Sequence, residues 1–137
     1  MRIRSLELVG FKSFGDRTVF AFDRGISAIV GPNGCGKSNV IDALRWVMGE
    51  HNPRHLRGRD MQDLIFAGTE RKPAVGMCEV ALTLDNSDGL APQPYGAFSE
   101  IPVSRRLHRS GESENTMNRV PVRHRVVAVA GQAGSAF

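Results

Sequence analysis

The chain has 137 residues, of which 41% are hydrophobic and 23% are charged. These shares are ordinary for a soluble globular protein, so we expect the chain to fold at least in part, and the length predicts one domain. No apolar run approaches the roughly 18 residues that a membrane-spanning helix needs, and the charged N-terminus is unlike a secretory signal. Two cysteines make no disulfide framework, so we expect a cytoplasmic protein with no membrane partner. A formal charge of +4 is compatible with an anionic partner.

The first segments predict strands. Residues 2–11 and 17–22 flank a turn-like segment and predict an antiparallel pair. Residues 26–31 form a β-branched apolar run, which is typical of a strand buried on both faces.

A helix is predicted next, because four apolar residues recur at helical spacing and form one stripe: Val40, Leu44, Val47 and Met48. Gly49 follows where a C-terminal cap is expected. The polar, basic segment 51–60 contains proline and glycine and is predicted to be a loop.

The second half predicts further strands. Residues 78–85 alternate, with one face formed by Val80, Leu82 and Leu84, and residues 85–89 predict a turn. Residues 101–109 and 116–123 are predicted to form a hairpin across residues 110–115.

Between the predicted strand and helix lies a phosphate-loop spacing, G-x-x-x-x-G-K-[ST], at Gly31, Gly36, Lys37 and Ser38. Glycines let backbone amides curl around phosphate oxygens, and the start of a helix favours negative charge. Lys37 adds a positive charge, and Ser38 can offer its hydroxyl to magnesium. The predicted ligand is a nucleoside triphosphate with Mg²⁺. The alternative is a glycine-rich turn whose lysine faces solvent.

Two short segments resemble catalytic motifs of nucleotide hydrolysis but lack the structural surroundings that those motifs require. Asp85 ends an apolar strand as a magnesium-binding aspartate would, but Asn86 stands where a catalytic glutamate is expected, and the string predicts a turn. Residues 109–115 contain a serine-glycine string, but they join two predicted strands and begin no helix. Machinery for hydrolysis is therefore not visible.

The cysteines are given no catalytic or metal role. Cys35 occupies a variable position of the phosphate loop, where a small side chain is favoured over a redox function. Cys35, Cys78 and the four histidines show no zinc-ligand spacing.

Basic residues gather in three clusters that are compatible either with DNA phosphates or with solvated faces. The clusters are Arg54, Arg57 and Arg59, then Arg105, Arg106, His108 and Arg109, then Arg119, Arg123 and Arg125.

Five strings resemble the N-terminal head segment of the bacterial SMC chromosome-partition ATPases. They are GFKSF (10–14), VGPNGCGKSN (30–39), DALRWVMGE (42–50), LRG (56–58) and DLIFAGTERK (63–72). RecN and RecF heads share the phosphate loop, but residues 63–72 and 109–114 favour SMC.

The resemblance implies an α/β fold, the N-terminal half of an ABC-type ATPase head, with a mixed sheet around the phosphate-loop helix and an antiparallel β subdomain. In that family the C-terminal head half supplies the remaining catalytic motifs, and two heads enclose two ATP molecules. The implied partners are that half, a second SMC head, DNA and accessory head-binding subunits, in a nucleoid-associated protein for chromosome condensation, segregation and partition. The chain alone is then expected to be inactive as an ATPase.

The resemblance also implies site residues. The nucleotide contacts are Gly31, Pro32, Asn33, Gly34, Cys35, Gly36, Lys37, Ser38, Asn39 and Lys12, with Ser38 on Mg²⁺. Arg57 resembles an arginine that couples DNA contact to hydrolysis, and the alternative for Arg57 is a solvated loop residue.

The family pattern covers residues 1–123, whereas residues 124–137 diverge from it. We expect this tail to be disordered or to come from a truncated or frame-shifted reading, and Gln132 is given no role. Two other functions stay open: a RecN- or RecF-like DNA-repair ATPase fragment, and a basic β-rich module that binds DNA without nucleotide.

Overall fold

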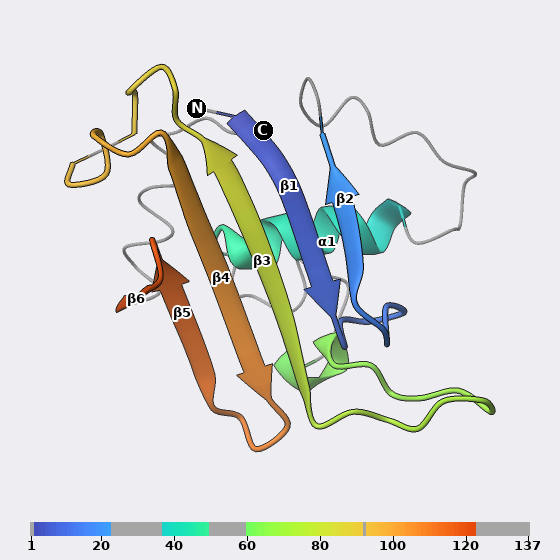
Figure 1. Ribbon diagram of the computed structural model, residues 1–137. Coiled ribbons are helices and arrows are strands. Elements are labelled where there is room, and N and C mark those ends of the chain that lie inside the picture. Colours follow the sequence, from blue (N-terminus) through green and yellow to red (C-terminus); the bar gives the residue numbers. More distant parts are fainter. Residues whose placement is uncertain (1, 23–36, 50–59, 92, 123–137) are drawn as a thin grey trace.

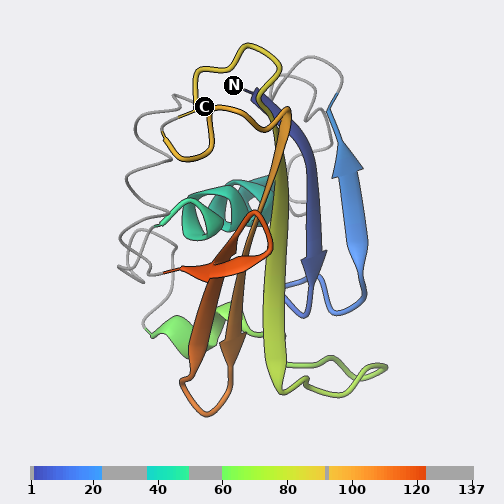
Figure 2. The same ribbon diagram turned by 60° about the vertical axis from the view of Figure 1, so that its left-hand side comes forward.

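Six strands and one α-helix make up the fold in a computed structural model, which describes residues 2–22, 37–49, 60–91 and 93–122 (Figure 1). The elements are β1 (Arg2–Val9), β2 (Thr18–Ala21), α1 (Lys37–Val47), the short 3-10 helix η3 (Met61–Leu64), β3 (Met77–Asp85), β4 (Glu100–His108), β5 (Ser113–Met117) and β6 (Val120–Val122). The strands form one sheet in the order β2-β1-β3-β4-β5-β6, and every described pairing is antiparallel. Helix α1 lies against one face of this sheet (Figure 2).

The central strands form by alternation. In β3 the predicted face of Val80, Leu82 and Leu84 is buried toward α1, and Cys78 is buried on the same face. In β1 the buried residues Ile3 and Leu6 are three positions apart, which a regular strand would place on opposite faces. A register shift between Ile3 and Ser5 brings both to the inner face, as a β-bulge does.

The predicted helix is confirmed. Its apolar stripe is buried against the inner face of the sheet and consists of Val40, Leu44, Val47 and Met48, joined by Ala43 and Trp46. Gly49 has a φ of 118° and its N–H donates to the carbonyl of Trp46 at 3.1 Å, so the predicted cap is confirmed as well. The predicted strand at 26–31 and residues 51–59 of the predicted loop at 51–60 lie outside the described residues.

The predicted strands 2–11 and 17–22 pair as β1 and β2, which confirms the opening antiparallel pair. The hairpin across residues 110–115 is also confirmed, because β4 pairs with β5, although β5 begins within that segment at Ser113. The serine-glycine string therefore joins two strands.

The prediction of one strand over 116–123 is wrong. The chain turns at Asn118 and Arg119, which have φ values of 54° and 66°, so β5 and β6 form a second hairpin with Met117 opposite Val120. Two positive φ values define the tight turn that suits the twist of a hairpin. An Asn-Arg pair lacks the glycine that usually marks this turn in a sequence.

The loop after β3 confirms the predicted turn at 85–89. The N–H of Ser87 donates to the carboxylate of Asp85 at 2.9 Å, and this bond holds the pKa of Asp85 below its usual range. Asn86 is buried, and its side chain bonds the carbonyls of Tyr95 and Phe98 and the N–H of Ala91. Asp85 and Asn86 thus shape the loop.

The turn after β1 depends on Gly10, which has a φ of 66°, and a Cβ there would lie 2.4 Å from the carbonyl oxygen of Met77. We expect Gly10→Ala to lower the free energy of unfolding by about 2 kcal/mol or more, because strain at such a backbone position adds to the clash. Urea unfolding followed by the fluorescence of Trp46, the one tryptophan of the sequence, measures this change.

Gly76→Ala is the control, because a Cβ at Gly76 meets nothing within 4 Å. Its effect is expected to stay within about 0.5 kcal/mol. Equal losses in the two variants would contradict the steric explanation.

Candidate nucleotide-binding site

The start of helix α1 carries the described part of the predicted site. Helix α1 begins at Lys37, and Ser38 in its first turn is exposed. The first N–H groups of a helix have no partner within it, so a free helix start attracts anions. The predicted contacts from Gly31 to Gly36 and the predicted Arg57 lie outside the described residues.

A small hairpin, residues 10–15, stands beside this helix start. The N–H of Phe11 donates to the carbonyl of Phe14 at 3.0 Å, and the N–H of Phe14 returns a bond to Phe11 at 2.8 Å. Lys12 and Ser13 form the tip of the hairpin, and Lys12 has a φ of 48°. A lysine rarely adopts this conformation, so the contacts around Lys12 must hold it there.

The tip of the hairpin contacts α1 through two side-chain pairs. The amide of Asn39 donates to the hydroxyl of Ser13 at 2.8 Å. The ammonium of Lys12 forms an ion pair with the carboxylate of Asp42 at 2.6 Å, and these side chains are only 11% and 3% exposed. The structure therefore brings Lys12, predicted from the family resemblance, to the first two turns of α1.

The other side of the hairpin is held by main-chain bonds from residues 64–66. The N–H of Lys12 donates to the carbonyl of Leu64, and the N–H of Phe66 donates to the carbonyl of Gly10, both at 2.7 Å. Segment 64–66 follows η3, whose N-terminus is capped reciprocally by Asp60 and Asp63. The hairpin thus joins the helix start to a segment more than twenty residues further along the chain.

At the other end of α1, Arg105 from β4 packs against Trp46. The guanidinium carbon lies 4.8 Å from the centroid of the indole ring, and one N–H donates to the carbonyl of Trp46 at 3.0 Å. Arg105 is only 7% exposed. A cation over an indole face and at a helix C-terminus is favourable on both counts. Phe11 packs beside the same ring, with centroids 5.6 Å apart.

The prediction that Arg105 belongs to a basic cluster that could contact DNA is therefore wrong, because a buried arginine cannot face DNA. Arg106 is paired with Glu79 at 2.7 Å. Arg109 donates to the carbonyl of Val75 at 2.8 Å. Periodicity could have separated these residues, since Arg105 shares its face of β4 with the buried Val103 and Leu107.

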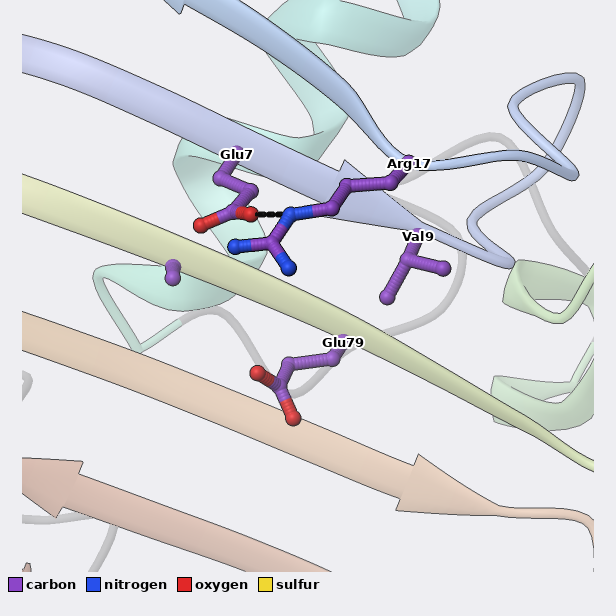
Figure 3. A pocket seen from close by; sticks show the side chains of 5 residues that line it. Glu7, Val9, Arg17 and Glu79 are labelled. Atoms are coloured by element: carbon purple, nitrogen blue, oxygen red, sulfur yellow. Dashed lines mark ion pairs between the residues drawn. The ribbon is translucent and has the colours of Figure 1, made fainter.

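A shallow pocket of about 150 Å³ lies on the outer face of the sheet, opposite α1 (Figure 3). It is lined by Glu7, Val9, Arg17, Glu79 and Ala81. Each carboxylate already has an arginine, since Arg17 pairs with Glu7 and Arg106 with Glu79. Glu79 and Arg106 lie opposite each other on β3 and β4, and Arg17 directly precedes β2, so both pairs support the sheet rather than the helix start.

Cys78 is buried in the core, and this burial raises the pKa of its thiol to about 12. At neutral pH the thiolate is therefore almost absent. Among the described residues no group of three histidine, cysteine or acidic side chains could hold a metal ion. Within the same ranges no helix has the length and apolar character to cross a membrane.

Solved structures show the class of fold. An SMC head bound to the C-winged helix domain of ScpA superposes with a TM-score of 0.89 at 34% identity, covering 100% of this chain and 42% of the other. A chain studied for ATP-driven dimerization and DNA stimulated activation of SMC ATPases gives a TM-score of 0.88 at 32% identity, covering 100% and 81%. The fold is the N-terminal half of an ABC-type ATPase head, as the family resemblance implies.

The family model described as RecF/RecN/SMC N terminal domain matches residues 2–131. The chain belongs to this family. The chromosome partition protein Smc of Myxococcus xanthus is 59% identical over 121 residues, which cover 87% of this chain and 10% of that protein. The chain thus spans about a tenth of the length of this relative. RecF superposes with a TM-score of 0.65 at 19% identity, which shows the fold alone, so the RecN or RecF alternative is the weaker one.

The contacts of Arg105 predict unequal effects for two neighbouring arginines. Arg105→Ala is expected to lower the free energy of unfolding by about 2 kcal/mol, because a buried cation–π contact and a charged hydrogen bond are lost together. Arg106→Ala removes partly exposed ion pairs on the opposite face and is expected to cost less than about 1 kcal/mol. Urea unfolding measures both, and the reverse order would contradict the assignment of Arg105 to the core.

Proposed function

We propose that this chain is the ATP-binding N-terminal head segment of an SMC-type ATPase that acts in chromosome condensation, segregation and partition. The observation that carries the proposal is the start of α1 at Lys37, directly after the phosphate-loop glycines, with Ser38 exposed in the first turn. Membership of the family and the close Smc relative support the same reading.

The proposed ligand is ATP with Mg²⁺. Residues 31–39 would surround the phosphates, with Lys37 on the terminal phosphates and Ser38 on the metal. Ser38 is exposed, which fits this role because a magnesium ligand must be accessible to the metal ion. When bound, the metal would neutralise phosphate charge. Lys12 and Arg57 are proposed to serve the same site, Lys12 beside the helix start and Arg57 in coupling DNA contact to hydrolysis.

Hydrolysis is proposed to need the C-terminal head half and a second head. The two strings that resemble catalytic motifs are turns in this structure: Asp85 and Asn86 shape one loop, and the serine-glycine string joins β4 to β5. The related heads described above support head dimerization driven by ATP and an accessory partner of the ScpA kind. We further propose that the protein binds DNA and lies in the cytoplasm at the nucleoid. The tail at residues 124–137 is proposed to diverge from the family.

The alternative of a DNA-binding module without nucleotide is less well supported. Its central basic cluster loses Arg105 to the core, while Arg106 and Arg109 bond partners within the chain. Arg119, the one member of the third cluster that lies within the described residues, is exposed on the β5–β6 turn.

Lys37→Ala is expected to weaken binding of Mg-ATP by at least about a hundredfold, because two charge-assisted contacts to phosphate are lost. Titration of the full chain with a fluorescent ATP analogue measures the Kd. Lys72→Ala is the matched control, since Lys72 is an exposed lysine paired with Asp16, and it should leave the Kd within about twofold. Absence of binding by the wild type would favour the DNA-binding module, and equal binding by the wild type and Lys37→Ala would place the nucleotide away from the phosphate loop.

The chain alone should hydrolyse ATP at the background rate. Adding the C-terminal head segment of the Myxococcus xanthus relative should raise turnover at least about tenfold, because it brings the missing catalytic groups. Phosphate release measures the rate, with Lys37→Ala as the blank. Turnover by the isolated chain that Lys37→Ala removes would refute the division of the active site.

A further inference from the structure

The second turn of α1 contains a buried carboxylate in an unexpected place. Asp42 is four residues after Ser38, so the two side chains lie on one face of the helix, with Cβ atoms about 5–6 Å apart. The Asp42 side chain is 3% exposed, so water screens its charge poorly. A polyphosphate bound at the start of α1 would therefore meet a negative charge one turn behind it.

The positively charged ammonium of Lys12 lies against this carboxylate. Its ammonium lies 2.6 Å from Asp42, and its own side chain is 11% exposed. The ammonium is brought there by the left-handed turn at Lys12, which the bond from its N–H to Leu64 stabilises. The left-handed conformation at Lys12 thus brings its ammonium against the carboxylate of Asp42 on α1.

We propose that Lys12 is a positioning residue whose ammonium neutralises the buried carboxylate of Asp42, so that the second turn of α1 does not repel a polyphosphate bound at its start. This inference rests on the proposed function. It differs from a direct contact between Lys12 and the nucleotide, because here Lys12 acts through Asp42.

Substitutions at Lys12 and Asp42 distinguish action through Asp42 from direct contact between Lys12 and the nucleotide. The following results are expected if Lys12 acts through Asp42. Lys12→Met leaves Asp42 charged and should weaken Mg-ATP binding about tenfold, the size expected for partly screened charges roughly 8 Å apart. Asp42→Asn removes the negative charge itself, so it should leave binding unchanged or tighten it by up to about tenfold. The double variant should return to within about threefold of the wild type. Lys12→Arg keeps the charge and should also stay within about threefold.

The exposed pair of Lys72 and Asp16 supplies the controls. Lys72→Met and Asp16→Asn make the same charge changes where solvent screens them, so both should leave the Kd within about twofold. The loss in Lys12→Met should also shrink as salt rises from about 50 to 500 mM, because the repulsion is electrostatic. Circular dichroism reports whether each variant is folded.

Each remaining outcome overturns the inference in a distinguishable way. A double variant as weak as Lys12→Met would assign Lys12 to direct contact with the nucleotide. Equal weakening by both single variants, insensitive to salt, would make the pair merely structural. If Lys12→Met does not fold, weaker binding by folded Asp42→Asn still refutes the proposal. Absence of binding by the wild type would refute the proposed function, and this inference with it.

Discussion

Helix α1 is held against the sheet by apolar packing along its length and by a buried charge at each end. Lys12 meets Asp42 near the start, and Arg105 meets Trp46 at the finish. Packing alone would allow a smooth apolar stripe to slide or rotate, whereas a paired charge tolerates little displacement because an unpaired buried charge is costly. The two contacts therefore fix where α1 starts, and the candidate nucleotide site depends on that position.

The fold around the helix could be predicted where burial follows a simple period. The alternation of β3 and the stripe from Val40 to Met48 gave the right elements, because one face of each packs on a common core. The β1 bulge and the Asn118–Arg119 turn could not be predicted, since both depend on backbone conformations that several residue types can adopt when neighbouring strands support them.

The candidate site was predictable in part. The phosphate-loop spacing predicts a nucleoside triphosphate as the ligand, and the family resemblance pointed to Lys12. No short pattern in the sequence indicates that Lys12 pairs with Asp42, thirty residues away. Strand alternation separates Arg105 from Arg106, but it does not indicate that Arg105 bonds Trp46 of the helix. These contacts depend on which strand lies beside which, and a single sequence does not contain that information in any short pattern.

The bonds between residues 64–66 and the hairpin have a consequence for sequence variation. They join main-chain atoms, at Lys12 to Leu64 and at Phe66 to Gly10, so segment 64–66 can make them with almost any side chain. An insertion or deletion within segment 64–66 would instead shift its donors and acceptors out of step with residues 10–12. Segment 64–66 should therefore keep these bonds through changes of residue type far more readily than through changes of length.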